Sequence, residues 1–382
     1  MNDTTRAALG GDSPMRRALD LALQGWGQTA PNPMVGAVVV RDGRIVGEGC
    51  HSRFGADHAE VSALRAAGEQ ARGATLYVTL EPCRHQGKTP PCTDAILAAG
   101  VKRVVIAVAD PTPLAGGGAA VLRQAGVDVE IGVLETDARE LNAAFFHAAS
   151  SDMPWTTLKL AVSMETAIAN ERGTTSWLTS PQSRAAVHRL RAGNDAVAVG
   201  VGTILADDPQ LNVREAPAPR KPPARVVFDR RLRTPIQSKI VLTARDTPTM
   251  LVTASAESPK ADQMREAGVH VIAAPDLRDG FRRLRAAGIR ALLVEGGAAL
   301  ASSVLAEKLA HRLVIFQAPV ALGPEALFAF DGAPPSVLRA LEHYTVLERK
   351  PLGPDVMTIY ALGAIGETGT IGAEVGGLGG AS

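Results

Sequence analysis

A histidine, a glutamate and two cysteines near the N-terminus have the types and spacing of a catalytic zinc site. His58 and Glu60 form a His-x-Glu pair, and Cys83 and Cys92 follow, each directly after a proline. One imidazole and two thiolates fill three tetrahedral positions of Zn²⁺ and leave the fourth open for water, which the metal acidifies. Glu60 is then available to carry a proton. The motif predicts metal-assisted hydrolysis, with His58, Cys83 and Cys92 as ligands and Glu60 as the catalytic acid/base.

Zinc-dependent nucleobase deaminases are built from the same parts, but their two cysteines are usually two residues apart. Here eight residues separate Cys83 from Cys92. The alternative is a structural zinc site. Such a site normally has four protein ligands, and the remaining cysteine, Cys50, has no ligand spacing to a partner.

The ligands are predicted to lie where helices begin. Residues 58–71 and 92–100 have helical patterns, so His58 and Cys92 would sit at helix N-termini, where the dipole and free N–H groups favour a thiolate. A β-hairpin is expected at residues 35–50, because Asp42-Gly43 supplies the positive φ angles of a tight turn.

The rest of the N-terminal half alternates between strands and helices, which predicts an α/β layer structure. A helix capped by Ser13 and Pro14 should come first. The other expected elements are strands at 75–80, 103–109 and 127–132 and helices at 119–125 and 136–148.

A polar stretch at 149–154, ending in proline, predicts a linker between two domains. A second α/β unit follows, with a helix at 181–192 and strands at 156–163, 195–200, 225–228, 250–253, 291–294, 312–317 and 356–362. We expect residues 1–12 to be flexible and the Gly-rich tail at 364–382 to be disordered.

Composition narrows the classes of partner. The 382 residues include 40 basic and 39 acidic ones, so no overall field attracts nucleic acid or an anionic membrane. No apolar run reaches the roughly 18 residues of a membrane-spanning helix. Three cysteines leave no disulfide framework, and no secretion signal begins the chain. We therefore expect a cytoplasmic protein whose partner is a small molecule, and a homo-oligomer stays open.

Residues from about 15 to 362 resemble the bifunctional riboflavin-biosynthesis enzymes that join a diaminohydroxyphosphoribosylaminopyrimidine deaminase to a 5-amino-6-(5-phosphoribosylamino)uracil reductase. The resemblance rests on the long Cys83 to Cys92 interval and on four further motifs, which are Thr29-Ala-Pro-Asn-Pro-Met-Val-Gly36, Lys88-Thr-Pro-Pro91, Leu205-Ala-Asp-Asp-Pro209 with Arg214, and Val294-Glu-Gly-Gly297. It implies a cytidine-deaminase-like three-layer domain at 13–148 and a dihydrofolate-reductase-like domain at 155–363.

The resemblance also implies two reactions in sequence. The first is zinc-dependent hydrolytic deamination of a phosphoribosyl diaminopyrimidinone, with one Zn²⁺ per chain. The second is NADPH-dependent reduction of the ribosyl chain to a ribityl chain. The partners implied are this small-molecule substrate and the two cofactors, with neither nucleic acid nor membrane.

Site residues follow from the same resemblance. Those expected at the cofactor are Ala161, Trp177, Thr203, Asp207, Gly297, Ala298, Ala299, Leu300, Ala301, Ser302 and Ser303. Those expected at substrates are Asn32, Thr175, Arg191, Leu211, Arg214 and Glu295. Lys159, inside an otherwise apolar strand, is expected near the reducing centre, because a buried lysine needs a partner.

Each assignment has a structural alternative. Asn32 could satisfy a turn, Arg191 and Arg214 could be solvated charges, Trp177 could be core, and Gly296-Gly297 could be an ordinary turn. Two rival functions remain as well. One is a deaminase of free or nucleic-acid bases, against which balanced charge and few aromatic residues count. The other is a deaminase whose C-terminal domain is a degenerate nucleotide-binding or dimerisation module.

The degenerate-module alternative is supported by a motif that differs from that of the family. Where relatives have Ser-x-Asp-Gly-Lys or Arg, this chain has Ser163-Met-Glu-Thr-Ala167, which loses a glycine and a basic charge beside the expected reductase cleft. Arg230 and Asp57 also replace residues that are usual in relatives. We expect both activities to survive, because Lys159, Asp207, Arg214 and Glu295 are all present.

Overall fold

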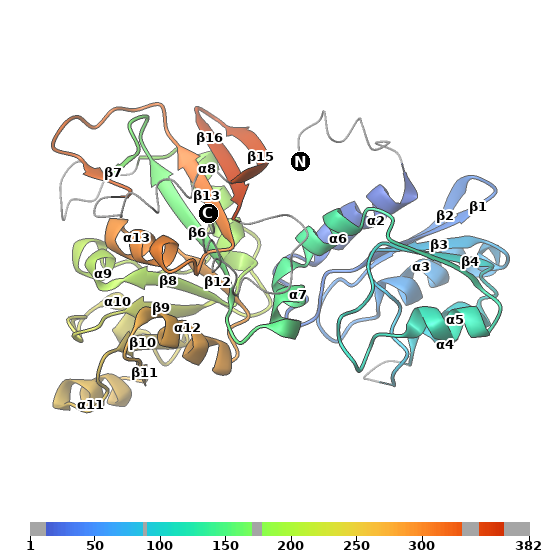
Figure 1. Cartoon of the computed structure of the whole chain (residues 1–382), viewed down its shortest axis with the longest axis horizontal. Coiled ribbons are helices and arrows are strands. Elements are labelled where there is room, and N and C mark those ends of the chain that lie inside the picture. Colours follow the sequence, from blue (N-terminus) through green and yellow to red (C-terminus); the bar gives the residue numbers. More distant parts are fainter. Residues whose placement is uncertain (1–12, 87–89, 170–177, 331–343, 363–382) are drawn as a thin grey trace, which may run out of the picture.

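The computed structural model describes residues 13–86, 90–169, 178–330 and 344–362. Two α/β lobes lie side by side, with helix α7 (Ala143–Ser150) between them (Figure 1). The N-terminal residues expected to be flexible and the tail expected to be disordered lie outside the described residues.

Among the described residues, the N-terminal lobe contains one sheet of five strands. Their spatial order is β2 (Arg44–Cys50), β1 (Gly36–Arg41), β3 (Thr75–Val78), β4 (Arg103–Ile106) and β5 (Asp128–Ile131). The expected hairpin is confirmed, because β1 pairs antiparallel with β2 and the turn residues Asp42 and Gly43 have φ values of 50° and 74°.

Helices cover both faces of this sheet and make it the middle of three layers. Successive side chains of β1 point to opposite faces of the sheet. Ala37 and Val39 pack in one core, and Val38 packs in the other. The first core includes α3 (Ala59–Ala67), α4 (Cys92–Ala98) and α5 (Gly118–Gln124). The second includes α2 (Pro14–Ala22), α6 (Glu135–Leu141) and α7, and the short helices η1 (Leu23–Gly25) and η2 (Gly68–Ala71) extend α2 and α3.

The prediction of one continuous helix at 136–148 is wrong. The chain forms α6 and α7 with Asn142 between them, at φ −114° and ψ 29°. The Asn142 amide accepts a hydrogen bond from the Met34 N–H and donates one to the Met34 carbonyl, both at 2.8 Å. This tertiary pairing replaces the continuous helical path and fixes the chain just before β1.

Among the described residues, the C-terminal lobe has a sheet of nine strands. In spatial order these are β11 (His270–Ala273), β10 (Thr249–Thr253), β9 (Ala224–Phe228), β8 (Ala196–Gly200), β12 (Ala291–Val294), β6 (Trp155–Val162), β13 (Arg312–Gln317), β16 (Asp355–Ala361) and β15 (Thr345–Leu352). All neighbouring strands from β11 to β13 pair in parallel. Strand β16 pairs antiparallel with β13 on one side and with β15 on the other. A separate pair joins β7 (Ala167–Ala169) to β14 (Leu327–Phe328).

Helices pack on both faces of the large sheet as well. One core includes α12 (Leu277–Ala286) and α13 (Ala298–Ala306). Other cores include α9 (Val201–Asp207), α10 (Lys239–Leu242) and α11 (Pro259–Glu266), with α8 (Pro181–Ala192) against β13 and β16. Because β12 is inserted between β8 and β6, the strand order reverses there, which is where α/β sheets bind ligands at the carboxyl ends of their strands.

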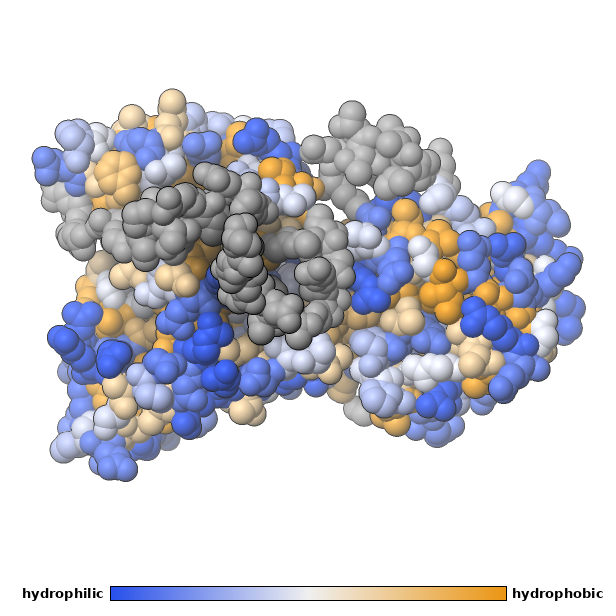
Figure 2. All heavy atoms as spheres, viewed as in Figure 1, coloured by the Kyte–Doolittle hydropathy of each residue, from blue (hydrophilic) through white to orange (hydrophobic). Residues whose placement is uncertain are grey.

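The surface mixes polar and apolar side chains, and on the face in Figure 2 hydrophobic residues gather only in small groups among hydrophilic ones. Across the described residues, no helix has both the length and the apolar character to cross a membrane.

Candidate functional site

Three predicted ligands come together in the N-terminal lobe. His58 Nδ1 lies 3.1 Å from Cys92 Sγ and 3.5 Å from Cys83 Sγ, and the ligand atoms all lie within 4.8 Å of one another. Tetrahedral bonds of roughly 2.1 Å to nitrogen and 2.3 Å to sulfur would place such atoms about 3.6 Å apart. Hydrogen bonds from Cys92 and His58 lower the pKa of the Cys83 thiol, which favours the thiolate. The donor set therefore fits Zn²⁺.

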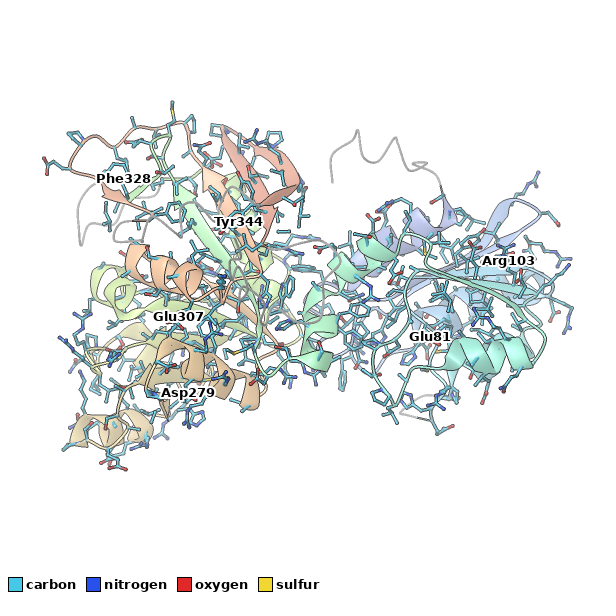
Figure 3. The ribbon with its side chains drawn as sticks, viewed as in Figure 1. Glu81, Arg103, Asp279, Glu307, Phe328 and Tyr344 are labelled. Carbon is cyan, nitrogen blue, oxygen red and sulfur yellow. The ribbon has the colours of Figure 1, made fainter. Side chains whose placement is uncertain are left out.

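Two of the three ligands lie at helix starts, as the sequence predicted. His58 is the N-cap of α3, and Cys92 is the first residue of α4, with its N–H directed to Cys83 Sγ at 3.4 Å. Cys83 lies in the loop after β3. Sequence reasoning missed Glu81, labelled in Figure 3, whose carboxylate accepts hydrogen bonds from the N–H groups of Asp110, Gly117 and Ala119 and so ties this loop to the start of α5.

Glu60 lies in the first turn of α3 and is only 4% exposed. Burial raises the pKa of its carboxyl group, although the charge of His58 opposes the shift. A carboxyl group whose pKa is moved towards neutrality can both accept and return a proton, which is what a proton carrier requires.

Asn32 is linked to the ligand set through His51. His51 is 3% exposed, and burial lowers its pKa, which favours the neutral ring. Its Nδ1 donates to the Asp57 carbonyl at 3.0 Å, which leaves Nε2 to accept from Asn32 Nδ2 at 3.3 Å. The His51 ring also meets the His58 ring edge-on, with centroids 5.5 Å apart. The Asp57 carboxylate, in a position where relatives have proline, pairs with Arg65 at 2.6 Å.

A large cavity opens in the C-terminal lobe at the strand-order reversal. Its volume is about 1060 Å³, and the carboxyl ends of β6, β8 and β12 reach it. The first turn of α13 borders the same cavity, so free N–H groups of a helix start are available to an anionic group. The size and the polar ends of these elements suit a nucleotide cofactor together with a substrate.

An ion pair and a lysine form the polar part of this cavity. Arg191 donates from Nε and Nη2 to the two carboxylate oxygens of Glu295, at 2.6 and 2.8 Å, and the side chains are 13% and 10% exposed. Burial would raise the pKa of Glu295, but Arg191 and Lys159 hold it below its usual range. Burial also lowers the pKa of Lys159, which lines the cavity as expected.

Most predicted residues of the second site line this one cavity. They are Lys159, Ala161, Arg191, Thr203, Asp207, Leu211, Arg214, Glu295, Gly297, Ala298, Ala299 and Leu300. Thr175 and Trp177 lie outside the described residues.

The far end of the predicted segment 297–303 does not line the cavity. Ala301 is fully buried, Ser302 is 7% exposed, and the Ser303 hydroxyl donates to the Ala299 carbonyl at 2.9 Å. The helix turns these side chains away after its first turn, so only Gly297 to Leu300 face the cavity.

The segment that departs from the family keeps a defined loop. Glu165 accepts hydrogen bonds from the N–H groups of Leu322 and Gly323, and its pKa is lowered to about 2, mainly by the first of these. Thr166 takes φ 68°, in the left-handed region that favours glycine. Threonine rather than glycine therefore adopts the left-handed conformation here. Arg230 is exposed and does not border the cavity.

Comparison with known proteins decides the family. The family model "Cytidine and deoxycytidylate deaminase zinc-binding region" matches residues 12–108, and "RibD C-terminal domain" matches residues 154–352. The riboflavin biosynthesis protein RibD of Aquifex aeolicus is 46% identical over 91% of this chain and 97% of its own. The chain belongs to the RibD family.

Other RibD proteins and their structures agree. Escherichia coli RibD is 40% identical over 90% of this chain and 96% of its own length. An Acinetobacter baumannii RibD structure covers 92% of this chain and 98% of its own, with 38% identity and a TM-score of 0.80. A Thermotoga maritima deaminase/reductase structure covers 91% and 97%, with 34% identity and a TM-score of 0.79. RibD membership confirms the predicted fold class, a deaminase-like domain followed by a reductase domain.

Proposed function

We propose that the two sites carry the two activities of the RibD family in one chain. The N-terminal domain is a zinc-dependent pyrimidine deaminase of riboflavin biosynthesis, and the C-terminal domain is a reductase that acts on the deaminated product. The observation that carries this proposal is the pairing of an open three-ligand metal set beside buried Glu60 with a second cavity that holds Lys159, Arg191 and Glu295.

In the first reaction, one Zn²⁺ per chain would be held by His58, Cys83 and Cys92 and would supply an acidified water at its open position. Glu60 is placed to take a proton from the attacking water and to return it to the departing amino group. The ring carbon gains the water's oxygen and loses ammonia, and the second proton of the water ends on the ring nitrogen, so the atoms balance. Asn32 binds the pyrimidine. One of its N–H groups is engaged by His51, and its Oδ1 is available to accept a hydrogen bond from the ring.

In the second reaction, bound NADPH would supply the hydride that reduces the ribosyl chain. Gly297 to Leu300 would offer free N–H groups to the cofactor's phosphates, and Ala161, Thr203 and Asp207 line the same cavity. Lys159, which lines the same cavity and lies in the electrostatic field of Glu295, is the proposed proton donor. Arg214 and Leu211, which both line the cavity, would hold the phosphoribosyl end, since a guanidinium matches a phosphate dianion.

A coupled assay tests both halves. Zinc-loaded protein is given the diaminopyrimidinone ribosyl phosphate, and ammonia release and NADPH absorbance are followed together. We expect ammonia first and NADPH oxidation after it. With Glu60→Gln, neither signal should arise from this substrate, yet NADPH oxidation should return when the deaminated intermediate is supplied.

The same assay tests the alternative of a degenerate C-terminal domain. Ammonia without NADPH oxidation, even from supplied intermediate, would show that the C-terminal domain is a degenerate module. Replacing NADPH by NADH measures which of the two cofactors the reductase prefers. A homo-oligomer is tested by the mass of the protein in solution.

We also propose a cytoplasmic setting, because the three cysteines are free thiols and the metal site needs two of them reduced.

A further inference from the structure

The loop that carries Asn32 is held by the C-terminal domain. The carbonyl oxygen of Gly27 accepts from the Arg220 N–H at 2.9 Å, that of Ala30 accepts from the Arg220 guanidinium, and that of Pro31 accepts from Arg290 at 3.2 Å. Three carbonyl groups in the six residues that end at Asn32 therefore have donors in the other domain.

Side chains of the same loop reach back across the junction. Trp26 Nε1 donates to the Arg189 carbonyl at 2.8 Å, and Gln28 Nε2 donates to the Ala218 carbonyl at 2.9 Å. The approach is close: a Cβ on Gly27, at φ 73°, would lie 2.7 Å from the Ala192 carbonyl oxygen. The loop is thus docked through both its backbone and its side chains.

Arg220 also holds the loop that leads from His51. Its guanidinium carbon lies 4.9 Å from the centroid of the Phe54 ring, and the Phe54 N–H donates to the Gln28 carbonyl at 3.0 Å. One side chain therefore touches the Asn32 loop at Ala30 and the His51 loop at Phe54. These two loops meet again at the hydrogen bond between Asn32 and His51.

We propose that Arg220 is a positioning residue for deamination: from the reductase domain it sets the register of the Asn32 and His51 loops, so the deaminase site is complete only when the two domains are docked. The inference rests on the proposed role of Asn32 in binding the pyrimidine. Arg220 touches no reacting atom and acts through Ala30 and Phe54.

The expected effect follows from the geometric tolerance of catalysis. A displacement of about 1 Å in a positioning group can reduce a rate on the order of 100-fold. Without the guanidinium, the Ala30 carbonyl loses its donor and the Phe54 ring loses its partner, while zinc ligands on α3 and α4 are untouched. The variant should therefore bind the deaminase substrate more weakly while it still binds zinc.

The experiment compares Arg220→Ala and Arg220→Lys with a matched control, Arg282→Ala, in the full zinc-loaded chain. Arg282 also bridges towards the other lobe, through Asp152 at 3.2 Å, but contacts neither loop in the described residues. For each protein we would measure kcat and KM for ammonia release, kcat/KM of the reductase with supplied intermediate, zinc content and Tm.

For Arg220→Ala we expect deaminase kcat/KM to fall by roughly 10- to 100-fold, mostly through KM, with unchanged zinc and a reductase within about twofold of wild type. Arg220→Lys should recover part of the loss, because it restores a donor but not the flat ring contact. Arg282→Ala should leave both activities as they are.

Two results would overturn the proposal: deaminase kinetics of Arg220→Ala equal to those of wild type, or an equal loss of both activities together with Tm. If Arg220→Ala fails to fold, Arg290→Ala is tested with the same measurements. It removes only the donor to the Pro31 carbonyl, so we expect a smaller loss of deaminase kcat/KM. Asn32→Ala separates the proposed substrate role of Asn32 from the positioning role of Arg220. If it leaves deamination intact, the proposed substrate role of Asn32 is wrong; if it abolishes deamination while Arg220→Ala does not, only the positioning inference is wrong.

Discussion

Glu295 and Arg191 form a two-pronged ion pair at the end of β12, with both carboxylate oxygens within 2.8 Å of guanidinium nitrogens. Lys159 lines the same cavity, so two cations share one carboxylate there. The cavity lining has five basic and three acidic side chains. It is suited to an anionic ligand, as a phosphoribosyl compound is.

Breaking this pair should affect stability and reduction together. For Glu295→Gln we expect the free energy of unfolding to fall by roughly 3 to 5 kcal/mol, because Arg191 is left buried without its counter-charge. The reductase should lose most of its activity, while ammonia release continues. Urea unfolding and the coupled assay measure the two effects. The exposed pair Arg17 and Glu48, 2.7 Å apart, is the control, since Glu48→Gln should cost less than about 1 kcal/mol.

Metal binding and proton transfer should separate at the zinc site. Glu60→Gln should retain zinc but slow ammonia release by about 100-fold or more, because it removes only the proton carrier. Cys83→Ser should lose zinc as well as activity. Zinc content by atomic emission, beside the ammonia assay, distinguishes the variants. Zinc lost with Glu60→Gln would mean that Glu60 supports the fold of the site.

Thr166 should be a strained residue that glycine relieves. A non-glycine residue in the left-handed region costs on the order of 1 to 3 kcal/mol, and Thr166 is β-branched at φ 68°. We expect Thr166→Gly to raise the free energy of unfolding by about 1 kcal/mol, net of the entropy of glycine. The control is Met164→Gly, at a neighbouring exposed residue without a positive φ, which should destabilise. A lower midpoint for Thr166→Gly in denaturant would contradict this account.

The contact between the lobes should be sensitive to acid. Burial lowers the pKa of His311 to about 3, and the charges of His147 and Arg312 add to the shift. An unfolded imidazole titrates near 6.5, so between these values the unfolded chain binds a proton that the folded chain does not. The stabilisation is therefore fully present above about pH 6.5 and is lost as the pH falls towards 3.

His311→Asn provides the matching test. His311 Nδ1 accepts a hydrogen bond from the Thr156 N–H at 3.0 Å, and an asparagine oxygen can replace that acceptor without titrating. Between about pH 7 and pH 4.5 we expect the free energy of unfolding of wild type to fall by a few kcal/mol, and that of the variant to fall less. Equal slopes for the two proteins would show that His311 is not responsible.

Local signals in the sequence were enough to predict which three ligand residues come together. The His-x-Glu pair and Pro91-Cys92 lie at helix starts, and Cys83 follows in the same short stretch of chain, so local structure determines much of the geometry. The hairpin at Asp42-Gly43 was predictable for the same reason, since its turn depends only on its own residues. The resemblance to a family supplied the second site, and the cavity gathers most of those residues.

Features that depend on distant partners were not predictable. Nothing in the helical pattern around Asn142 reveals that its amide would pair with the Met34 backbone. Strand β15 was missed because its outer, polar residues lack the apolar alternation of a buried strand. The joining of Arg191 to Glu295, 104 residues away, follows only from how β12 is inserted into the sheet.

The docking of the Asn32 loop has an evolutionary consequence. Arg220 and Ala218 meet residues that precede them by 190 positions, so part of the first domain's substrate loop is completed by the second domain's sequence. A gene rearrangement that separated the domains would leave backbone carbonyl groups of that loop without their donors, a loss of about 1 kcal/mol or more for each one that stays buried. Selection on the first activity would therefore act on residues of the second domain, and the fusion would be inherited as one unit.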